Sequence, residues 1–111
     1  MTEGTTITIN DFENIELCIA KVLEVSEIDG ADRLLKLRVD IGSEERQLVA
    51  GIKMSYETEE LVGKNIVIVA NLKPVRLRGV DSEGMLLAAQ TKDGPVLVTS
   101  ERDAEPGAVV K

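Results

Sequence analysis

The sequence of 111 residues predicts an all-β domain, a five-stranded Greek-key barrel with one short helix between its third and fourth strands. Three observations lead to this fold class. Apolar and charged residues alternate along Leu35–Ile41, as they do in a half-buried strand. Turns that contain glycine separate the apolar segments. The segment Thr58–Gly63, with acids in its first turn and a terminal glycine, has the pattern of a helix of one or two turns.

The chain begins with a polar lead, and residues 1–9 are predicted to end as a strand. This expectation rests on Ile7–Ile9, where apolar residues alternate with a threonine. Asn10 is a suitable N-cap for a one-turn helix over Asp11–Ile15, in which Phe12 and Ile15 face the core together.

Three strands are predicted next, joined by short turns. Leu17–Ile28 is the first, and the slip in its alternation near Val22-Leu23 indicates a bulge or a strand that coils around a barrel. Asp29-Gly30 turns the chain toward the second strand, Leu35–Ile41. The third strand is predicted over Arg46–Ile52.

Two more strands complete the predicted barrel. Asn65–Leu72 is the fourth, and the fifth includes Met85–Ala89 after a connecting loop. Five strands with a short helix between the third and the fourth are the element order of an OB-fold. That fold binds ligands over its second and third strands, between loops 1–2 and 4–5.

The chain is long enough for one domain, which we expect to span residues 1–111, with the barrel at 10–90 and a C-terminal extension at 91–111. Short strands are predicted in this extension at Val96–Thr99 and Ala108–Val110. The extension and the lead carry apolar side chains that a five-stranded barrel leaves without a partner. We expect these segments to pair across a twofold axis, giving a homodimer.

Composition excludes most classes of enzyme. The chain has no histidine and one cysteine, Cys18, so it has no Ser-His-Asp triad, Cys-His dyad, intrachain disulfide or zinc site of the usual ligands. The adjacent carboxylates at Glu44-Glu45 and Glu59-Glu60 are explained by a turn and a helix start. No phosphate-cradling glycine motif is present. We expect a non-catalytic protein without a metal or cofactor.

The sequence also predicts no association with a membrane. Its longest apolar runs, Ile66–Ala70 and Met85–Ala89, have five residues each, whereas a membrane span needs about 20. The first residues are polar and lack the apolar region of a secretory signal. We therefore expect a cytoplasmic location.

The charge distribution indicates a binding face. The net charge is −7, yet residues 33–78 hold nine bases and six acids. Loop 4–5 of the predicted OB-fold carries Lys73, Arg76 and Arg78, a combination that suits contacts with phosphates. The alternative is that these are ordinary solvated charges. Further candidate cations for the same face are Arg33, Lys36, Lys53 and Lys64.

Aromatic content narrows the class of nucleic acid. Phe12 and Tyr56 are the only aromatic residues, and the predicted second and third strands have none. Proteins that bind single strands stack bases on aromatic side chains. A folded RNA held by its shape and its phosphates therefore fits this composition better.

The segment Asn71–Ala89, N-L-K-P-V-R-L-R-G-V-D-S-E-G-M-L-L-A-A, resembles the tRNA-binding domain that is appended to methionyl-tRNA synthetases and also occurs free-standing. The runs D-F-E-N-I-E-L, A-D-R-L-L, L-V-A-G-I and V-A-N-L stand in the order of this family. The resemblance implies an OB-fold, a homodimer, and binding of the tRNA body without reading of the anticodon. It also implies that Ser82 and Met85 lie at the RNA-facing edge, where a hydroxyl can bond phosphate and a thioether can rest on a base. The alternatives are a turn hydroxyl for Ser82 and core packing for Met85. Asn71 is a further RNA-binding candidate, although we expect it to fix the loop backbone rather than to touch RNA. Cys18, Ala20 and residues 28–30 depart from the residues common in the family.

We therefore expect an accessory tRNA-binding protein, with tRNA as its ligand and methionyl-tRNA synthetase as a candidate partner. Two alternatives stay open. One is a protein-binding export chaperone of the CsaA type, which shares this fold and pattern. The other is a scaffold subunit that docks on a synthetase through protein contacts.

Overall fold

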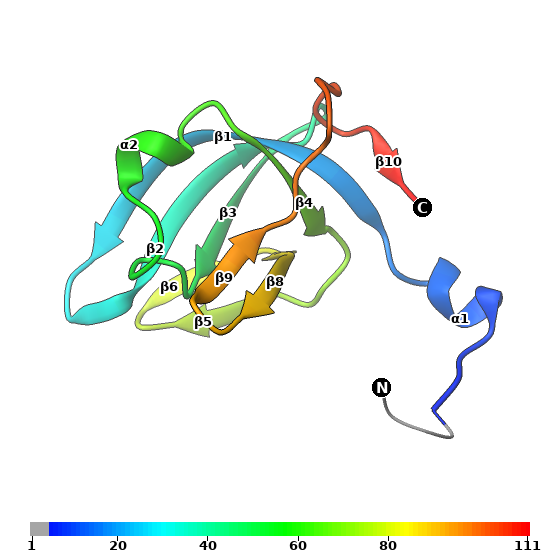
Figure 1. The fold of residues 1–111 in the computed structure, drawn as a ribbon, viewed down its shortest axis with the longest axis horizontal. Helices are drawn as coiled ribbons and strands as arrows, with labels where there is room; N and C mark the ends of the chain where they lie inside the picture. The colour runs from blue at the N-terminus through cyan, green and yellow to red at the C-terminus, as the bar shows by residue number, and fades with distance from the viewer. Residues whose placement is uncertain (1–4) are drawn as a thin grey trace.

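The computed structural model describes residues 5–111 and shows a predominantly β structure with two short helices in that range (Figure 1). The predicted all-β fold class is confirmed, and its first strand has the predicted bounds. The elements are α1 (Ile9–Glu13), β1 (Leu17–Ile28), β2 (Ala31–Asp40), β3 (Glu45–Ala50), α2 (Thr58–Leu61), β4 (Asn65–Val69), β5 (Val75–Leu77), β6 (Val80–Ser82), β7 (Met85–Leu86), β8 (Ala88–Thr91), β9 (Gly94–Leu97) and β10 (Val109–Val110).

The main sheet has the antiparallel order β3-β2-β1-β4-β7, and β10 adds to β1. Strand β1 pairs with β4 along its first residues and with β2 from Lys21 onward. The register with β2 shifts between Val22 and Glu24, where the sequence predicted a slip. This bulge bends β1, so one strand serves two partners and the sheet curls toward a barrel.

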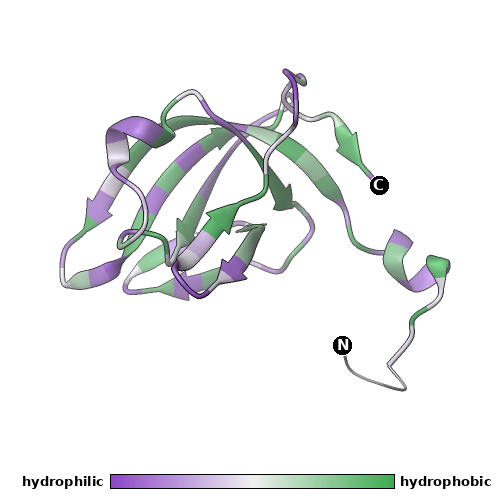
Figure 2. Cartoon of the chain, in the orientation of Figure 1, coloured by the Kyte–Doolittle hydropathy of each residue, from purple (hydrophilic) through white to green (hydrophobic). Residues whose placement is uncertain are grey.

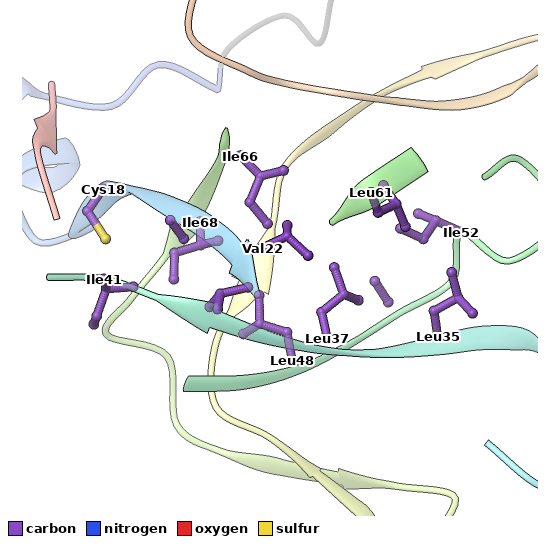
Figure 3. Close-up of a cluster of buried hydrophobic side chains, with 13 residues drawn as sticks. Cys18, Val22, Leu35, Leu37, Ile41, Leu48, Ile52, Leu61, Ile66 and Ile68 are labelled. Atoms are coloured by element: carbon purple, nitrogen blue, oxygen red, sulfur yellow. The ribbon is translucent and has the colours of Figure 1, made fainter. Parts of the chain in front are cut away.

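The core fills the concave side of this curled sheet. Leu35, Leu37 and Val39 of β2 are fully buried, because alternate residues of a strand face the same side. They meet Leu48 of β3 and the isoleucines of β4 (Figure 3). Helix α2 contributes Leu61, which is also fully buried and packs into the same cluster.

The two end strands of the sheet, β3 and β7, are joined through the turn that precedes β7. The backbone N–H of Val49 donates to the hydroxyl of Ser82 at 3.0 Å. Gln47 and Glu83 form two hydrogen bonds. The N–H of Gln47 donates to the carboxylate of Glu83 at 3.0 Å, and the N–H of Glu83 donates to the carbonyl of Gln47 at 2.8 Å. Gly84 follows at φ 147°, where a Cβ would lie 2.9 Å from the carbonyl oxygen of Val69. We call this join between β3 and residues 82–84 the seam.

The N-terminal prediction was wrong about the lead strand, the N-cap and the core-facing pair, since Ile15 is 42% exposed and lies outside α1. Ile7 lies outside any strand and Ile9 begins α1, so no lead strand forms within the described part of residues 1–9; residues 1–4 lie outside it. Thr8, rather than Asn10, caps the helix. Its hydroxyl accepts from the N–H of Asp11 at 3.1 Å, and the Asp11 carboxylate accepts from the N–H of Thr8 at 3.1 Å. This reciprocal capping box outweighs the weak alternation of the lead.

Loop 4–5 and the fifth strand are also more elaborate than the sequence predicted. The loop contains the hairpin β5–β6, and the apolar run Met85–Ala89 is divided between β7 and β8. Strand β8 pairs with β9 as a separate hairpin, and Leu97 of this hairpin packs against the main core. None of the helices in residues 5–111 is long and apolar enough to cross a membrane.

Two glycines allow the C-terminal extension to pack closely against the barrel. Strand β10, which has the hydrophobic colour in Figure 2, pairs with the start of β1. Before it, Gly107 at φ +87° packs against Gly42 at φ +89°, and the N–H of Gly107 donates to the carbonyl of Ile19 at 2.7 Å. A Cβ on Gly107 would overlap the carbonyl oxygen of Ile41.

We therefore expect Gly107→Ala to lower the free energy of unfolding by about 3 kcal/mol, since it adds steric overlap to left-handed backbone strain. Gly63→Ala is the matched control, because Gly63 has φ +89° and no atom within 4 Å of a Cβ. It should cost only about 1–2 kcal/mol, the strain alone. Urea unfolding measures the stability of both variants. Equal losses of stability would show that the extension shifts to accommodate the added methyl group.

Candidate nucleic-acid interface

The hairpin β5–β6 presents the predicted cations of loop 4–5. Its two strands are joined by the two-residue turn Arg78-Gly79, with φ +52° and +79°. Turns of this kind favour Asn-Gly or Asp-Gly, because both central residues adopt positive φ. An arginine at the first position carries backbone strain of about 1–3 kcal/mol. Strain of this kind at an exposed hairpin tip makes Arg78 a candidate for a functional role.

The hairpin has one face toward solvent and one toward the barrel. Arg76 stands opposite Asp81 on the solvent face, and their side chains form an ion pair at 3.0 Å. The two side chains are 67% and 59% exposed, so the pair contributes little to stability. Val80 and Ser82 lie on the other face and contact the barrel. Arg76 is therefore open to solvent but shares its charge with a carboxylate.

The hairpin packs beside the turn between β1 and β2. Val80 lies against a small cluster formed by Ile28, Ala31 and Val49, separate from the main core. Figure 1 shows the tips of both turns at the same end of the molecule. The tertiary structure thus brings loops 1–2 and 4–5 together, as an OB-fold binding face requires.

The cations of this end differ in how far neighbouring acids neutralise them. Arg33 and Lys53 come together because the N–H of Lys53 donates to the carbonyl of Arg33 at 3.2 Å. Lys53 also pairs with Glu27 at 3.1 Å. Within residues 5–111, no ion pair involves Arg33, Lys36, Lys73 or Arg78. Among the predicted RNA-binding cations, these four are the ones without an ion pair in the described residues.

Two other basic residues are occupied within the chain. Arg38 lies between Glu24 and Glu45, and hydrogen bonds to these carboxylates raise the pKa of its guanidinium. Lys64 lies over the ring of Tyr56, 5.8 Å from its centroid, away from the hairpin.

Lys36 is half-buried and lines a shallow cleft with Ser26 and Gln47.

Of the two roles considered for Ser82, the structure favours a turn hydroxyl over a phosphate contact. Ser82 is only 3% exposed, and its hydroxyl accepts from the N–H of Val49 and donates to the carbonyl of Gly84, both at 3.0 Å. It is a seam residue. Met85 behaves differently, because it is 49% exposed and lies on the rim of a cleft between β3 and β7. Met85 therefore remains available for contact with a ligand.

Asn71 fixes backbone, as the sequence analysis proposed. Its side-chain oxygen accepts from the N–H of Glu16 at 2.9 Å, and its amide nitrogen donates to the carbonyl of Asn14 at 2.7 Å. These bonds join the start of loop 4–5 to the connection between α1 and β1. Both ends of the side-chain amide are thereby engaged.

Sequence reasoning missed Arg46, which contacts both ends of the same loop, and Gln47, which contacts its returning end. Arg46 donates to the carbonyls of Ala70 and Glu83, and the amide of Gln47 donates to the carbonyl of Asp81 at 2.8 Å. No sequence signal marks these residues, because their partners are more than twenty positions away.

Two observations on the described residues bear on catalysis. Cys18 is buried, and burial raises the pKa of its thiol, which disfavours the reactive thiolate. No group of three or more acidic or cysteine side chains in residues 5–111 is arranged to hold a metal ion. The arrangement can therefore offer cations and an exposed thioether to a ligand.

Fold and site together define a small β-barrel with a cationic hairpin, and comparison with known proteins agrees. Residues 17–109 match the family model described as "Putative tRNA binding domain". The chain belongs to this tRNA-binding domain family.

Its relatives include methionine–tRNA ligases. The chain is 52% identical to the enzyme of Thermotoga maritima over 108 residues, which are 97% of this chain and 17% of that protein. It is 51% identical to the enzyme of Methanococcus aeolicus over 104 residues, 94% of this chain and 15% of that protein. The chain thus spans only about a sixth of the length of these relatives.

Two solved structures are similar over nearly their full length. One is a MetRS-related protein from Pyrococcus horikoshii, with a TM-score of 0.90 and 36% identity, covering 96% of this chain and 99% of that one. The other is the CsaA chaperone protein from Picrophilus torridus, with a TM-score of 0.89 and 32% identity, covering 96% and 100%.

The buried hydroxyl of Ser82 yields a stability prediction. Ser82→Ala removes the partner of the Val49 N–H and should lower the free energy of unfolding by about 1–3 kcal/mol. Ser26→Ala, an exposed strand serine, should change it by less than about 0.5 kcal/mol. Denaturant titration measures the difference. If both variants unfold at the wild-type midpoint, the seam does not depend on this hydroxyl.

Proposed function

We propose that this chain is an accessory, non-catalytic tRNA-binding protein that holds the body of tRNA through phosphate and shape contacts. The observation that carries the proposal is the convergence of the β5–β6 hairpin with the β1–β2 turn at one cationic end. Arg78 at the hairpin tip and Arg33 beside the turn are both without carboxylate partners among the described residues. Lys73, Arg76, Lys36 and Lys53 supply further charge, and Met85 supplies an apolar contact.

The type of ligand follows from what this end offers. Guanidinium and ammonium groups suit phosphate oxygens, whereas the face has no aromatic side chains on which single-stranded bases would stack. A folded RNA with closely spaced phosphates matches this set of contacts. Because the net charge of the chain is −7, binding would depend on local cations and fall steeply with salt.

The accessory role is inferred from the relatives. This chain corresponds to a minor part of methionine–tRNA ligases, and the whole ligase activity is not expected from it. We propose that it supports aminoacylation in the cytoplasm, with methionyl-tRNA synthetase as a partner. The absence of histidine and the buried, unreactive Cys18 support a role without catalysis.

We also propose that the chain forms a homodimer through the end opposite the hairpin tip. Ile9 of α1 and Val109 of β10 are 72% and 73% exposed, which is unusual for large apolar side chains that stay in water. Between α1, β1 and β10 lies a cavity of about 550 Å³ with mainly apolar walls, including Phe12 and Val110. A second copy could cover these residues with the same surface, which is the geometry of a twofold interface.

A second candidate function is the binding of unfolded protein chains. It is favoured by the likeness to the CsaA chaperone and by the partly exposed Leu72, Val75 and Leu77 of loop 4–5. Binding of an unfolded polypeptide that total tRNA does not displace would favour this function over the first.

The proposed RNA site predicts a large effect of charge reversal in the hairpin. Arg76→Glu with Arg78→Glu should weaken tRNA binding by more than about tenfold at moderate salt. Each lost phosphate contact should also reduce the slope of log K against log salt by roughly one unit. Filter binding at several salt concentrations measures both quantities. Stability should change by less than about 0.5 kcal/mol, because the side chains are exposed.

The matched control is Arg102→Glu. Arg102, like Arg76, is an exposed arginine with one carboxylate partner, Glu101, but it lies in the C-terminal extension. A local site predicts a much smaller loss for this variant. Equal losses from Arg76→Glu, Arg78→Glu and Arg102→Glu would mean that binding is a diffuse charge effect without a site.

The proposed dimer predicts a mass of about twice 12.0 kDa in light scattering at micromolar concentration. Val109→Asp should shift the protein to the monomer, because an unpaired carboxylate would be buried in the interface. Val62→Asp is the control, since Val62 is also exposed but follows α2 on another part of the barrel. A wild-type monomer under these conditions would refute the interface.

A further inference from the structure

The segment that carries the proposed RNA contacts leaves the barrel and returns to it at neighbouring points. It departs after Ala70, at the end of β4, and comes back at Glu83, just before β7. Between these residues lie loop 4–5 and the whole β5–β6 hairpin. The carbonyl groups of Ala70 and Glu83 therefore mark the two roots of one excursion, residues 71–82.

Arg46 of β3 binds both roots with a single side chain. One terminal nitrogen of its guanidinium, Nη1, donates to the carbonyl of Ala70 at 2.8 Å and to the carbonyl of Glu83 at 3.0 Å. Its Nε donates to the carboxylate of Glu44 at 2.6 Å, which fixes the plane of the group. The guanidinium thus connects the two ends of residues 71–82 by hydrogen bonds.

The environment of Arg46 separates it from the other cations of the face. Its side chain is only 22% exposed, whereas that of Arg76 is 67% exposed. Its Nη1 and Nε are both engaged within the protein. Only Nη2 is left without a protein partner among the described residues, on a side chain that is mostly buried, so Arg46 is better suited to holding backbone in place than to binding RNA directly.

A lysine at this position could not make the same set of hydrogen bonds. Arginine is planar, and its donors have fixed directions, so Nε and Nη1 can serve separate acceptors at the same time. A lysine ammonium is a single point of charge on a flexible stem. Arg46→Lys therefore preserves the charge of the molecule while it loses the fixed geometry that joins Ala70, Glu83 and Glu44.

The outgoing root has a second attachment, independent of Arg46. Asn71 binds Glu16 and Asn14, and the N–H of Ala70 donates to the carbonyl of Glu16 at 2.7 Å. The returning root is held at Gln47 and Val49 through the seam. Arg46 is the side chain that joins the two attachments to each other.

We propose that Arg46 is a positioning residue for tRNA binding: it fixes the base of residues 71–82 so that Arg76 and Arg78 are held where the phosphates lie. This inference rests on the proposed function. A hairpin that is placed before binding loses less conformational entropy when the ligand arrives, which strengthens binding without a new contact.

The test compares the full chain with its Arg46→Lys variant. We expect the dissociation constant for total tRNA to rise roughly fivefold at fixed salt, from the cost of ordering the hairpin. The slope of log K against log salt should stay unchanged, because no phosphate contact is lost. Amide hydrogen exchange in residues 75–82 should accelerate, while exchange in the core of β1 and β2 should keep its wild-type rate. Arg102→Lys, the same substitution in the C-terminal extension, should change none of these quantities.

Three results would overturn the positioning role. The first is wild-type affinity in Arg46→Lys. The second is a salt slope reduced by about one unit, which would make Arg46 a direct phosphate contact. The third is exchange that accelerates equally in the hairpin and in β1, which would make Arg46 a general stabiliser of the fold. If wild-type protein binds no tRNA, the proposed function fails, and the exchange comparison alone decides whether Arg46 fixes the hairpin.

Discussion

The structure depends on how the last edge of a curled sheet is satisfied. Strand β3 is one edge of the sheet, and it does not pair with β7, the strand at the other edge. The backbone groups on the outer side of β3 therefore need other partners. The hydroxyl of Ser82 and the backbone and carboxylate of Glu83 supply these partners. Because buried polar groups are costly when unpaired, this seam has to form for the barrel to close. The hairpin that ends at Ser82 is fixed to the barrel as a consequence.

The placement of the cations follows from that constraint. With its returning strand held at β3, the hairpin can lie only beside the β1–β2 turn, where Val80 covers the cluster of Ile28 and Val49. An acidic chain thereby gathers unpaired cations at one end. Two acids of that end are paired, Asp81 with Arg76 and Glu27 with Lys53, whereas Asp29 and Asp32 beside the β1–β2 turn take part in none of the ion pairs of the described residues. Local arrangement, and not net charge, makes the surface suitable for a polyanion.

The opposite end has a different character, and the two ends are physically connected. Exposed apolar side chains on α1 and β10 surround a cavity whose wall includes Arg46 and Ala70. Asn71 ties the same region to the start of the hairpin segment. Residues that shape the apolar end therefore also set the geometry of the cationic end. The family relationship indicates tRNA as the class of ligand, and this connection would keep the proposed binding site in a fixed geometry.

The sequence by itself determined the features that depend on neighbouring residues: the extent of β1, its bulge near Val22, and helix α2 with its terminal glycine. Alternation and capping are local, so they can be recognised without knowledge of the fold. The hairpin β5–β6 escaped prediction because Arg78-Gly79 is not a usual turn sequence. The tertiary structure alone decided that Ser82 is buried and that Arg46 joins Ala70 to Glu83. Those roles depend on which strands meet, and hydrogen bonds between positions 24 to 37 residues apart leave no periodic trace in the chain.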